Sequence, residues 1–452
     1  MSRGRVCAFE YRYGSEEMKR ILEANNFMKK MLLVEAALVK VLEKLGIAPK
    51  GCYEKVSMEA SGITFEEVQE LEKSLGHETA ALAILLARRC GECGKYVHLG
   101  LTSNDVIDTA WALVLREALD LVKKRLCRLI ELCISIAEKH RNTVMVGRTH
   151  GQHALPITFG FKMANYVYEF SRSLERLLES EKRIIRGKIA GAVGTMASWG
   201  SLGEAIERGV LEELGLEPHA VTTQVAPRDG FAELACNLAV LASQLDRLAL
   251  EVRELSRTEI SEVGIAEERI GSSTMPHKKN PVTAERVSGL ARVCRSLCLA
   301  LLENIVLMHE RDLTNSSCER VVIPHILLVV DQMLLDTLGF LEKLAVDERK
   351  MMENLKLTKG AIASECLMMK LVLKRGIPRH EAHEALMKLS RKALSENRSF
   401  REVLEESELS RLLDEKDVME CFDYHSYTGR AGELIDRALS YARGVLEKVR
   451  AC

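Results

Sequence analysis

A regular apolar repeat between residues 231 and 255 constrains the fold more than any other feature of the sequence. The apolar positions alternate in steps of three and four for more than three heptads: Leu234, Leu238, Leu241, Leu245, Leu248, Val252 and Leu255. This spacing is typical of a helix that buries one stripe of side chains in a helical seam. We therefore predict a long helix that packs along its whole length against other helices.

Four further long stretches contain few helix-breaking residues, at roughly 103–140, 157–188, 282–309 and 325–345. At a rise of 1.5 Å per residue, the first would form a rod of about 55 Å. Only 8 residues are proline and aromatic residues make up 5%, a composition that favours helix over sheet. We predict an all-α fold without strand ladders, in which these five long helices form a central bundle.

The long helices divide the 452 residues into three predicted helical domains. These are an N-terminal domain at 1–101, a central bundle at 102–345 that carries the signature loop described below, and a C-terminal domain at 346–452. Rods of this length cannot easily bury their apolar stripes on a compact monomer. We expect the bundle to assemble into a multi-subunit helical core.

Charge and hydropathy exclude several classes of partner. Lys and Arg number 64 against 65 Asp and Glu, and a formal net charge of -1 does not suit a nucleic-acid-binding protein. The longest apolar run, around 321–330, contains Pro324 and His325, so we expect no membrane span. The first 14 residues carry charges and no apolar stretch of signal-peptide length, which favours the cytoplasm.

The 13 cysteines are scattered, and only Cys90 and Cys93 have the spacing of a metal half-site. Because no second pair and no histidine motif accompany them, ordinary thiols are favoured over zinc. Disulfides would fit a hyperthermophilic source. The spacing itself predicts no particular pairing.

The most specific motif occupies residues 271–281 and reads Gly-Ser-Ser-Thr-Met-Pro-His-Lys-Lys-Asn-Pro. Asn280 and Pro281 suit the N-cap and the first position of a helix, so we predict a loop that leads into the next rod. A plain connection between helices does not need this length or these polar residues. The composition therefore favours a functional loop.

This segment resembles the signature loop of the fumarase and aspartase superfamily, GSSxMPxKxNP, at every fixed position. Two further superfamily regions follow the expected order, HLGLTSND at 98–105 and GRTHGQHA at 147–154. Taken alone, Thr102 with Asp105 could form a capping box, and His150 could be an ordinary loop histidine. Together with the loop, on an all-helical chain, the three regions indicate the superfamily.

Within the superfamily the chain most resembles the adenylosuccinate lyase family, over nearly its whole length. The supporting segments are residues 11–13, 76–78, 222–225, 310–320 and 357–360. Argininosuccinate lyases usually carry Gln, and fumarases and aspartases Gly, where His277 stands. The 3-carboxy-cis,cis-muconate cycloisomerase branch, or another lyase of this superfamily, is the main alternative because it shares the MPHK and GQHA sequences. Two segments depart from the family pattern: His77-Glu78 replaces His-Asp, and residues 227–230 replace Arg-Asp-Arg.

The resemblance implies a β-elimination that releases fumarate in purine biosynthesis, from adenylosuccinate to give AMP and from SAICAR to give AICAR. It assigns proton abstraction to Ser272, protonation of the leaving amine to His150, and orientation of that histidine to Glu285. Lys278 would stabilise the dianionic transition state. A serine base needs desolvation and nearby positive charge. No nucleotide-binding loop or metal cluster is evident in the sequence, and we expect no cofactor and no metal.

The resemblance also implies the substrate contacts and the assembly. The succinyl carboxylates would be bound by Thr102, Ser103, Thr149 and Gln224, with Asn280 nearby. Arg12, Arg311, Ser316 and Arg320 match phosphate and ribose contacts, since guanidinium groups bind phosphate in bidentate geometry, and Tyr13 and His77 are also expected in the substrate site. The family further implies a homotetramer whose active sites are shared between subunits. A non-enzymatic, crystallin-like helical protein is an alternative that the four catalytic residues disfavour.

Overall fold

The computed structural model of the chain describes residues 6–266, 275 and 278–451. Over these residues it contains seventeen α-helices and three pairs of short strands. The predicted all-α class is confirmed. The prediction that strand ladders are absent was wrong, because three two-stranded ladders are present, and one of them carries predicted site residues.

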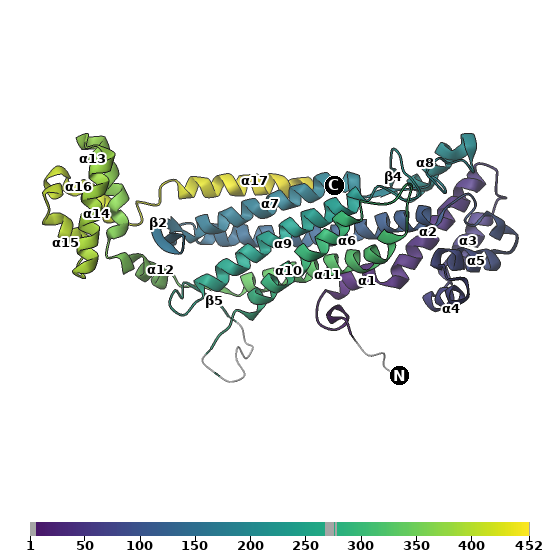
Figure 1. Cartoon of the computed structure of the whole chain (residues 1–452), viewed down its shortest axis with the longest axis horizontal. Coiled ribbons are helices and arrows are strands. Elements are labelled where there is room, and N and C mark those ends of the chain that lie inside the picture. Colours follow the sequence, from purple (N-terminus) through teal and green to yellow (C-terminus); the bar gives the residue numbers. More distant parts are fainter. Residues whose placement is uncertain (1–5, 267–274, 276–277, 452) are drawn as a thin grey trace. The chain divides into compact units, whose positions relative to one another are not determined.

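Five long helices dominate the chain, and four of them begin within two residues of their predicted start (Figure 1). Their bounds are α6 Ser103–Lys139, α7 Phe159–Ile184, α9 Asp229–Leu255, α10 Val282–Glu303 and α11 Thr314–Glu342. The seven apolar positions of the α9 repeat are all at most 4% exposed. The predicted seam of α9 is therefore confirmed.

The helix α11 differs most from its prediction, because it begins about eleven residues early and continues through Pro324. An interior proline lacks an N–H donor and costs a helix about 3 kcal/mol. Beyond it, Ile326, Leu327 and Val329 are at most 1% exposed. Burial of each such side chain contributes about 1.5–3 kcal/mol, which is enough to offset the proline.

The same helix is the one described segment long and apolar enough to cross a membrane by length and composition. However, 72% of its most apolar window is buried inside the protein. This burial is the pattern of a core helix in a folded domain.

The chain divides into two compact units, and each long helix contributes residues to both. The first unit comprises Met1–Leu126, Ser173–Leu245 and Val287–Leu335, and the second comprises Cys127–Arg172, Asp246–Arg286 and Asp336–Cys452. The division into three domains at residues 101 and 345 follows the order of the elements along the chain, and it stays a prediction.

In the first unit, short helices pack around α2 and form a core with the start of α6 (Figure 1). These helices are α1 Glu16–Leu22, α2 Ala24–Lys44, α3 Cys52–Ser61, α4 Phe65–Leu75, α5 Glu78–Cys90 and α8 Gly203–Glu213. A short parallel pair joins β3 Arg186–Gly187 to β4 Glu217–Pro218. Helix α5 brings His77 and Glu78 to the start of α6.

In the second unit, four helices from α13 to α16 form a separate small core. The helices after α11 are α12 Glu348–Leu355, α13 Ser364–Arg375, α14 Arg379–Ser395, α15 Phe400–Glu405, α16 Glu415–Phe422 and α17 Ala431–Ala451. Antiparallel pairs join β1 Val144–Thr149 to β2 Gln152–Thr158 and β5 Val263–Ile265 to β6 Leu344–Val346. The β1–β2 hairpin packs against α12.

Among its described residues, each unit contains one disulfide that the sequence did not predict. Cys52 is bonded to Cys93 across 41 residues of sequence, and Cys366 to Cys421 across 55. Cys93 is therefore half of a disulfide and not of a metal site, while Cys90 is a buried free thiol. Both bridges lie in the apolar cores of their units.

We expect the double substitution Cys52→Ala/Cys93→Ala to destabilise the protein. In the chain-entropy model, removing a cross-link that closes 41 residues costs about 4 kcal/mol of unfolding free energy. Denaturant unfolding under non-reducing conditions measures the change. Cys90→Ala, which removes a buried thiol but no cross-link, is the matched control. Equal unfolding midpoints for the two variants would contradict the predicted role of the bridge.

Candidate functional site

The predicted site residues fall into two groups that belong to different units. The first unit carries Arg12, Tyr13, His77, Thr102, Ser103, Gln224, Arg311, Ser316 and Arg320. The second carries Thr149, His150, Lys278, Asn280 and Glu285. Ser272 lies outside the described residues. Each group is described within its own unit.

In the first unit, the loop before α6 is fixed by its own motif residues. The backbone N–H of His98 and its Nδ1 atom bond to the fully buried carboxylate of Glu35, at 2.8 and 2.6 Å. Gly100 has a φ of +71°, and a Cβ atom there would lie 2.4 Å from the ring of Trp199. Glycine is therefore required at this position. The histidine and glycine of this motif set the path of the chain into Thr102.

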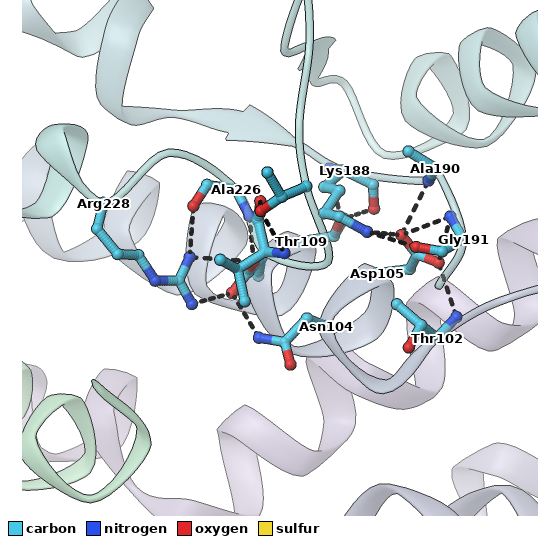
Figure 2. Close-up of polar contacts among 12 residues, drawn as sticks. Thr102, Asn104, Asp105, Thr109, Lys188, Ala190, Gly191, Ala226 and Arg228 are labelled. Carbon is cyan, nitrogen blue, oxygen red and sulfur yellow. Dashed lines mark hydrogen bonds and ion pairs between the residues drawn. The ribbon is translucent and has the colours of Figure 1, made fainter. Parts of the chain in front are cut away.

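The first turn of α6 is held by the buried carboxylate of Asp105 (Figure 2). This carboxylate accepts the N–H groups of Thr102 and Ala190 at 2.8 Å and of Gly191 at 3.0 Å. It also pairs with Lys188, and both side chains are fully buried. Burial raises the pKa of Asp105, while Lys188 and the N–H donors oppose that change. The cluster ties the chain after β3 to the turn that begins with Thr102 and Ser103.

One turn further along α6, a second buried cluster joins three elements. Arg228 lies 2.9 Å from both Asp108 and Glu319, and the N–H of Ala226 donates to Asp108 at 2.7 Å. The three charged side chains are at most 5% exposed. Burial lowers the pKa of Arg228, but the two carboxylates outweigh burial and raise it. Arg228, which lies in the segment at 227–230 that departs from the family pattern, thus forms two internal ion pairs.

His77 contacts Ser103, which brings two predicted binding residues together. The Nδ1 atom of His77 caps α5 by accepting the N–H of Ala80 at 3.3 Å. The Nε2 atom therefore carries the proton in this arrangement and donates to the Ser103 hydroxyl at 3.2 Å. His77 thus links the first turn of α5 to the first turn of α6.

Arg311, Ser316 and Arg320 line one pocket of about 230 Å³ in the first unit. Arg311 donates to the side-chain oxygen of Gln224 at 3.1 Å, so a predicted phosphate residue contacts a predicted succinyl residue. Arg320 pairs with Glu78 at 2.7 Å. The pocket therefore combines two guanidinium groups, a hydroxyl and the carboxylates of Glu78 and Glu319 between apolar walls.

Arg12 and Tyr13 lie outside the residues that line this pocket. The Arg12 guanidinium stands over the Tyr13 ring at 5.8 Å. The next two residues are tied to α11, since the N–H groups of Gly14 and Ser15 donate to Gln332 and Asp331. The N-terminal segment is thus held beside the helix that carries Ser316 and Arg320.

In the second unit, Thr149 and His150 lie at the tip of the β1–β2 hairpin. Thr149 pairs with Gln152, so His150 and Gly151 form a two-residue turn with φ values of +53° and +73°. Positive φ at both positions is the signature of a type I′ turn, and histidine tolerates it better than most residues do. Both predicted site residues are exposed there.

Next to its turn, this hairpin is held by a buried acid. Arg148 donates to both carboxylate oxygens of Glu262, at 2.9 and 2.6 Å, and Asn354 donates to the same group at 2.8 Å. Glu262 is fully buried. Burial, followed by the charge of Arg148, lowers the pKa of His153 on the opposite strand.

The described part of the signature loop leads into α10, which begins at Val282, one residue later than predicted. Lys278 and Glu285 are exposed, and Asn280 helps to line a pocket of about 300 Å³. Among the described residues, no hydrogen bond or ion pair links His150 to Glu285. The catalytic roles of these residues stay predictions.

The sequence did not predict the charged residues that hold these sites in place, namely Lys188, Asp108, Arg228, Glu319 and Glu262. Their charged partners lie 83 or more residues away, so no local pattern identifies these ion pairs. In the described ranges, no group of three or more His, Cys, Asp or Glu side chains could hold a metal ion.

Comparisons with known proteins agree with the resemblance seen in the sequence. A family model described as lyase matches residues 21–295, and one described as adenylosuccinate lyase C-terminus matches residues 360–438. An adenylosuccinate lyase of Pyrococcus horikoshii is 45% identical over 96% of this chain and 98% of its own. That of Methanocaldococcus jannaschii is 41% identical over 96% and 95%.

Solved structures match nearly the whole chain as well. A fumarate lyase from Mesorhizobium sp. BNC1 is 29% identical with a TM-score of 0.88, covering 97% of this chain and 100% of its own. A 3-carboxy-cis,cis-muconate lactonizing enzyme from Pseudomonas putida has the same identity and TM-score, covering 97% and 99%. The helical architecture is thus shared with a fumarate lyase and with a lactonizing enzyme.

Proposed function

Since the chain belongs to the adenylosuccinate lyase family, we propose that it cleaves adenylosuccinate to AMP and fumarate, and SAICAR to AICAR and fumarate. The observation that carries the proposal is 45% identity to an adenylosuccinate lyase over 96% of the chain. The pocket that contains Arg311, Ser316 and Arg320 adds an anion site suited to a nucleotide phosphate. Both reactions belong to purine biosynthesis.

The proposed reaction needs a base, an acid and stabilisation of a dianion. Ser272 removes the proton beside the succinyl carboxylate, and the C–N bond then breaks as His150 protonates the departing nitrogen. Lys278 stabilises the negative charge that builds up on the carboxylate. Glu285 orients His150. Thr102, Ser103, Thr149, Gln224 and Asn280 hold the succinyl group, and His77 lies beside them.

The phosphate clamp consists of Arg12, Arg311, Ser316 and Arg320, with Tyr13 next to Arg12. In the free chain Arg320 is paired with Glu78. A phosphate dianion competes with this carboxylate for the guanidinium group, because paired N–H groups bind phosphate in bidentate geometry. Substrate binding therefore replaces one ion pair by another.

The protein is further proposed to be a cytoplasmic homotetramer whose active sites are shared between subunits. The long apolar helices support assembly, and α10 and α11 keep large apolar side chains exposed on the single chain, among them Leu299, Leu302 and Val321. A closed symmetric assembly would bury such stripes.

The absorbance spectrum on mixing with adenylosuccinate tests the proposed activity directly. A spectral change with release of fumarate supports it, and an unchanged spectrum at high enzyme concentration contradicts it. The alternative activity is that of a carboxymuconate cycloisomerase, favoured by the structural match to the Pseudomonas putida enzyme. Turnover of 3-carboxy-cis,cis-muconate, without turnover of adenylosuccinate, would establish that alternative.

We expect Arg320→Ala to weaken AMP binding by about 10- to 100-fold, since a charge-assisted hydrogen bond contributes about 1.5–3 kcal/mol. Arg311→Ala should act in the same direction. Calorimetric titration with AMP measures both changes. Arg183→Ala is a matched control, because Arg183 is 54% exposed and paired with Glu233, as Arg320 is 56% exposed and paired with Glu78. Unaltered affinity would remove the substituted residue from the clamp.

A further inference from the structure

Two buried amide side chains line the pocket of the phosphate clamp, and neither has a role in the reaction so far. Asn104 lies in the first turn of α6 and is 2% exposed, and Asn315 lies in the first turn of α11 and is 1% exposed. The side-chain oxygen of each is buried without a hydrogen-bond partner. Such atoms are rare in folded proteins, because a buried acceptor without a donor costs about 1–3 kcal/mol.

The orientation of both amides follows from the buried cluster around Arg228. The NH₂ group of Asn104 donates to Asp108 at 3.2 Å, and that of Asn315 donates to Glu319 at 2.9 Å. A carboxylate that is paired with an arginine accepts hydrogen bonds and cannot donate them. Flipping either amide would bring two acceptor oxygens together. The NH₂ groups must therefore face the cluster, as Figure 2 shows for Asn104, whose oxygen is turned away from it.

The neighbours of these oxygens indicate which part of a ligand they would contact. Asn315 directly precedes Ser316 on α11, and both line the same pocket as Arg311 and Arg320. Its volume of about 230 Å³ is below the range of about 300–1,000 Å³ that encloses whole drug-sized ligands. A pocket of this size suits one portion of a nucleotide, and the portion joined to the phosphate is the ribose.

The geometry points to Asn104 and Asn315 as specificity-determining residues whose side-chain oxygens accept hydrogen bonds from the ribose hydroxyl groups of the bound nucleotide. This inference rests on the proposed function. The ribose supplies two adjacent O–H donors beside the phosphate, and two residues that line the pocket supply unpaired acceptor oxygens whose orientation is fixed before binding. Bound ligand would then satisfy both buried oxygens. Preorganised acceptors of this kind reject ligands that lack the matching donor.

Calorimetric titration of the wild-type protein with AMP, 2′-deoxy-AMP and 3′-deoxy-AMP tests the inference without any substitution. We expect the loss of a bonded hydroxyl to weaken binding about tenfold. Wild-type protein that binds AMP and both deoxy analogues with equal affinity would overturn the inference. Because the protein is unchanged, this comparison does not depend on whether a variant folds.

Asn315→Ala and Asn104→Ala then assign each oxygen to a hydroxyl. Each variant should bind AMP more weakly, and the difference between AMP and one deoxy analogue should vanish in it, since the same hydrogen bond is already missing. Asn165→Ala is the matched control, because Asn165 also donates to an acid four residues later, Glu169, but on an exposed helix face. It should bind all three ligands as the wild type does. Unchanged ratios in both variants would overturn the assignment.

Turnover of adenylosuccinate, measured on the same wild-type preparation, tests the proposed function separately from the roles of Asn104 and Asn315. Absent turnover contradicts the proposed function itself. Turnover combined with equal affinity for AMP and the deoxy analogues leaves the proposed function intact and overturns only the roles of Asn104 and Asn315.

Discussion

Ser272→Ala should abolish turnover while leaving nucleotide binding nearly intact. The hydroxyl is proposed to act on a proton in the transition state, so it contributes little to the affinity of the ground state. Loss of a general base lowers the rate by about 10²–10⁴-fold. Steady-state turnover of adenylosuccinate, together with calorimetric titration of AMP, measures the two effects on one preparation.

Thr274→Ala provides the matched control for this experiment. Thr274 belongs to the same loop and also carries a hydroxyl, but it occupies one of the variable positions of the superfamily pattern. Its replacement should leave turnover within a few-fold of wild type. A Ser272→Ala protein that turns over within tenfold of wild type would exclude the serine as the base, and a large loss of AMP affinity would show that it acts in binding.

The helical architecture was predictable wherever one face of a helix is apolar over many turns. The α9 repeat predicted a buried stripe, and all seven of its positions are buried. The start of α11 was predicted wrongly, because a proline usually ends a helix and Pro324 lies inside this one. Helix propensity does not take into account the burial of the side chains that follow the proline. The β1–β2 hairpin was not predicted, for a different local reason. Its strands of six and seven residues are short, and the type I′ turn places a histidine where asparagine or glycine is usual.

The contacts that hold the sites in place could not be predicted from the sequence, because they join residues far apart in the chain. Lys188 and Asp105 are separated by 83 residues, and Arg228 and Glu319 by 91. Locally, such charges look like solvated surface, since charged residues are seldom fully buried without a partner. The disulfides pose the same difficulty, as 13 scattered cysteines do not reveal their pairing.

The candidate site was predictable only in part and from two kinds of signal. The motifs identified Thr102, Ser103 and His150, and the structure places them at a helix start and a hairpin tip, where polar groups are accessible. Arg311, Ser316 and Arg320 came from resemblance alone, and they line one pocket. The roles of Asn104 and Asn315 depend on which way each amide faces, which only the buried cluster around Arg228 fixes.

Mixing two inactive variants, His150→Ala and Ser272→Ala, should restore activity after brief dissociation and reassociation. Among the described residues no hydrogen bond or ion pair links His150 to Glu285 within one chain, although the proposed mechanism needs them adjacent. A site shared between subunits of a tetramer with dihedral symmetry removes this conflict. Each site would then take His150 from one subunit and Ser272 from another. With random exchange of equal amounts, about a quarter of the sites receive both intact residues, so roughly a quarter of wild-type activity is the ceiling.

Two measurements make this result interpretable. Mass spectrometry of the reassociated sample must detect mixed oligomers, which shows that subunits have exchanged. Each parent variant, taken alone through the same treatment, provides the baseline, because both should remain inactive. Activity well above this baseline requires sites that combine residues of two chains, since no single chain in the mixture carries both intact residues. Mixed oligomers without activity would show that His150 and Ser272 act from one chain, and the shared-site proposal would then be wrong.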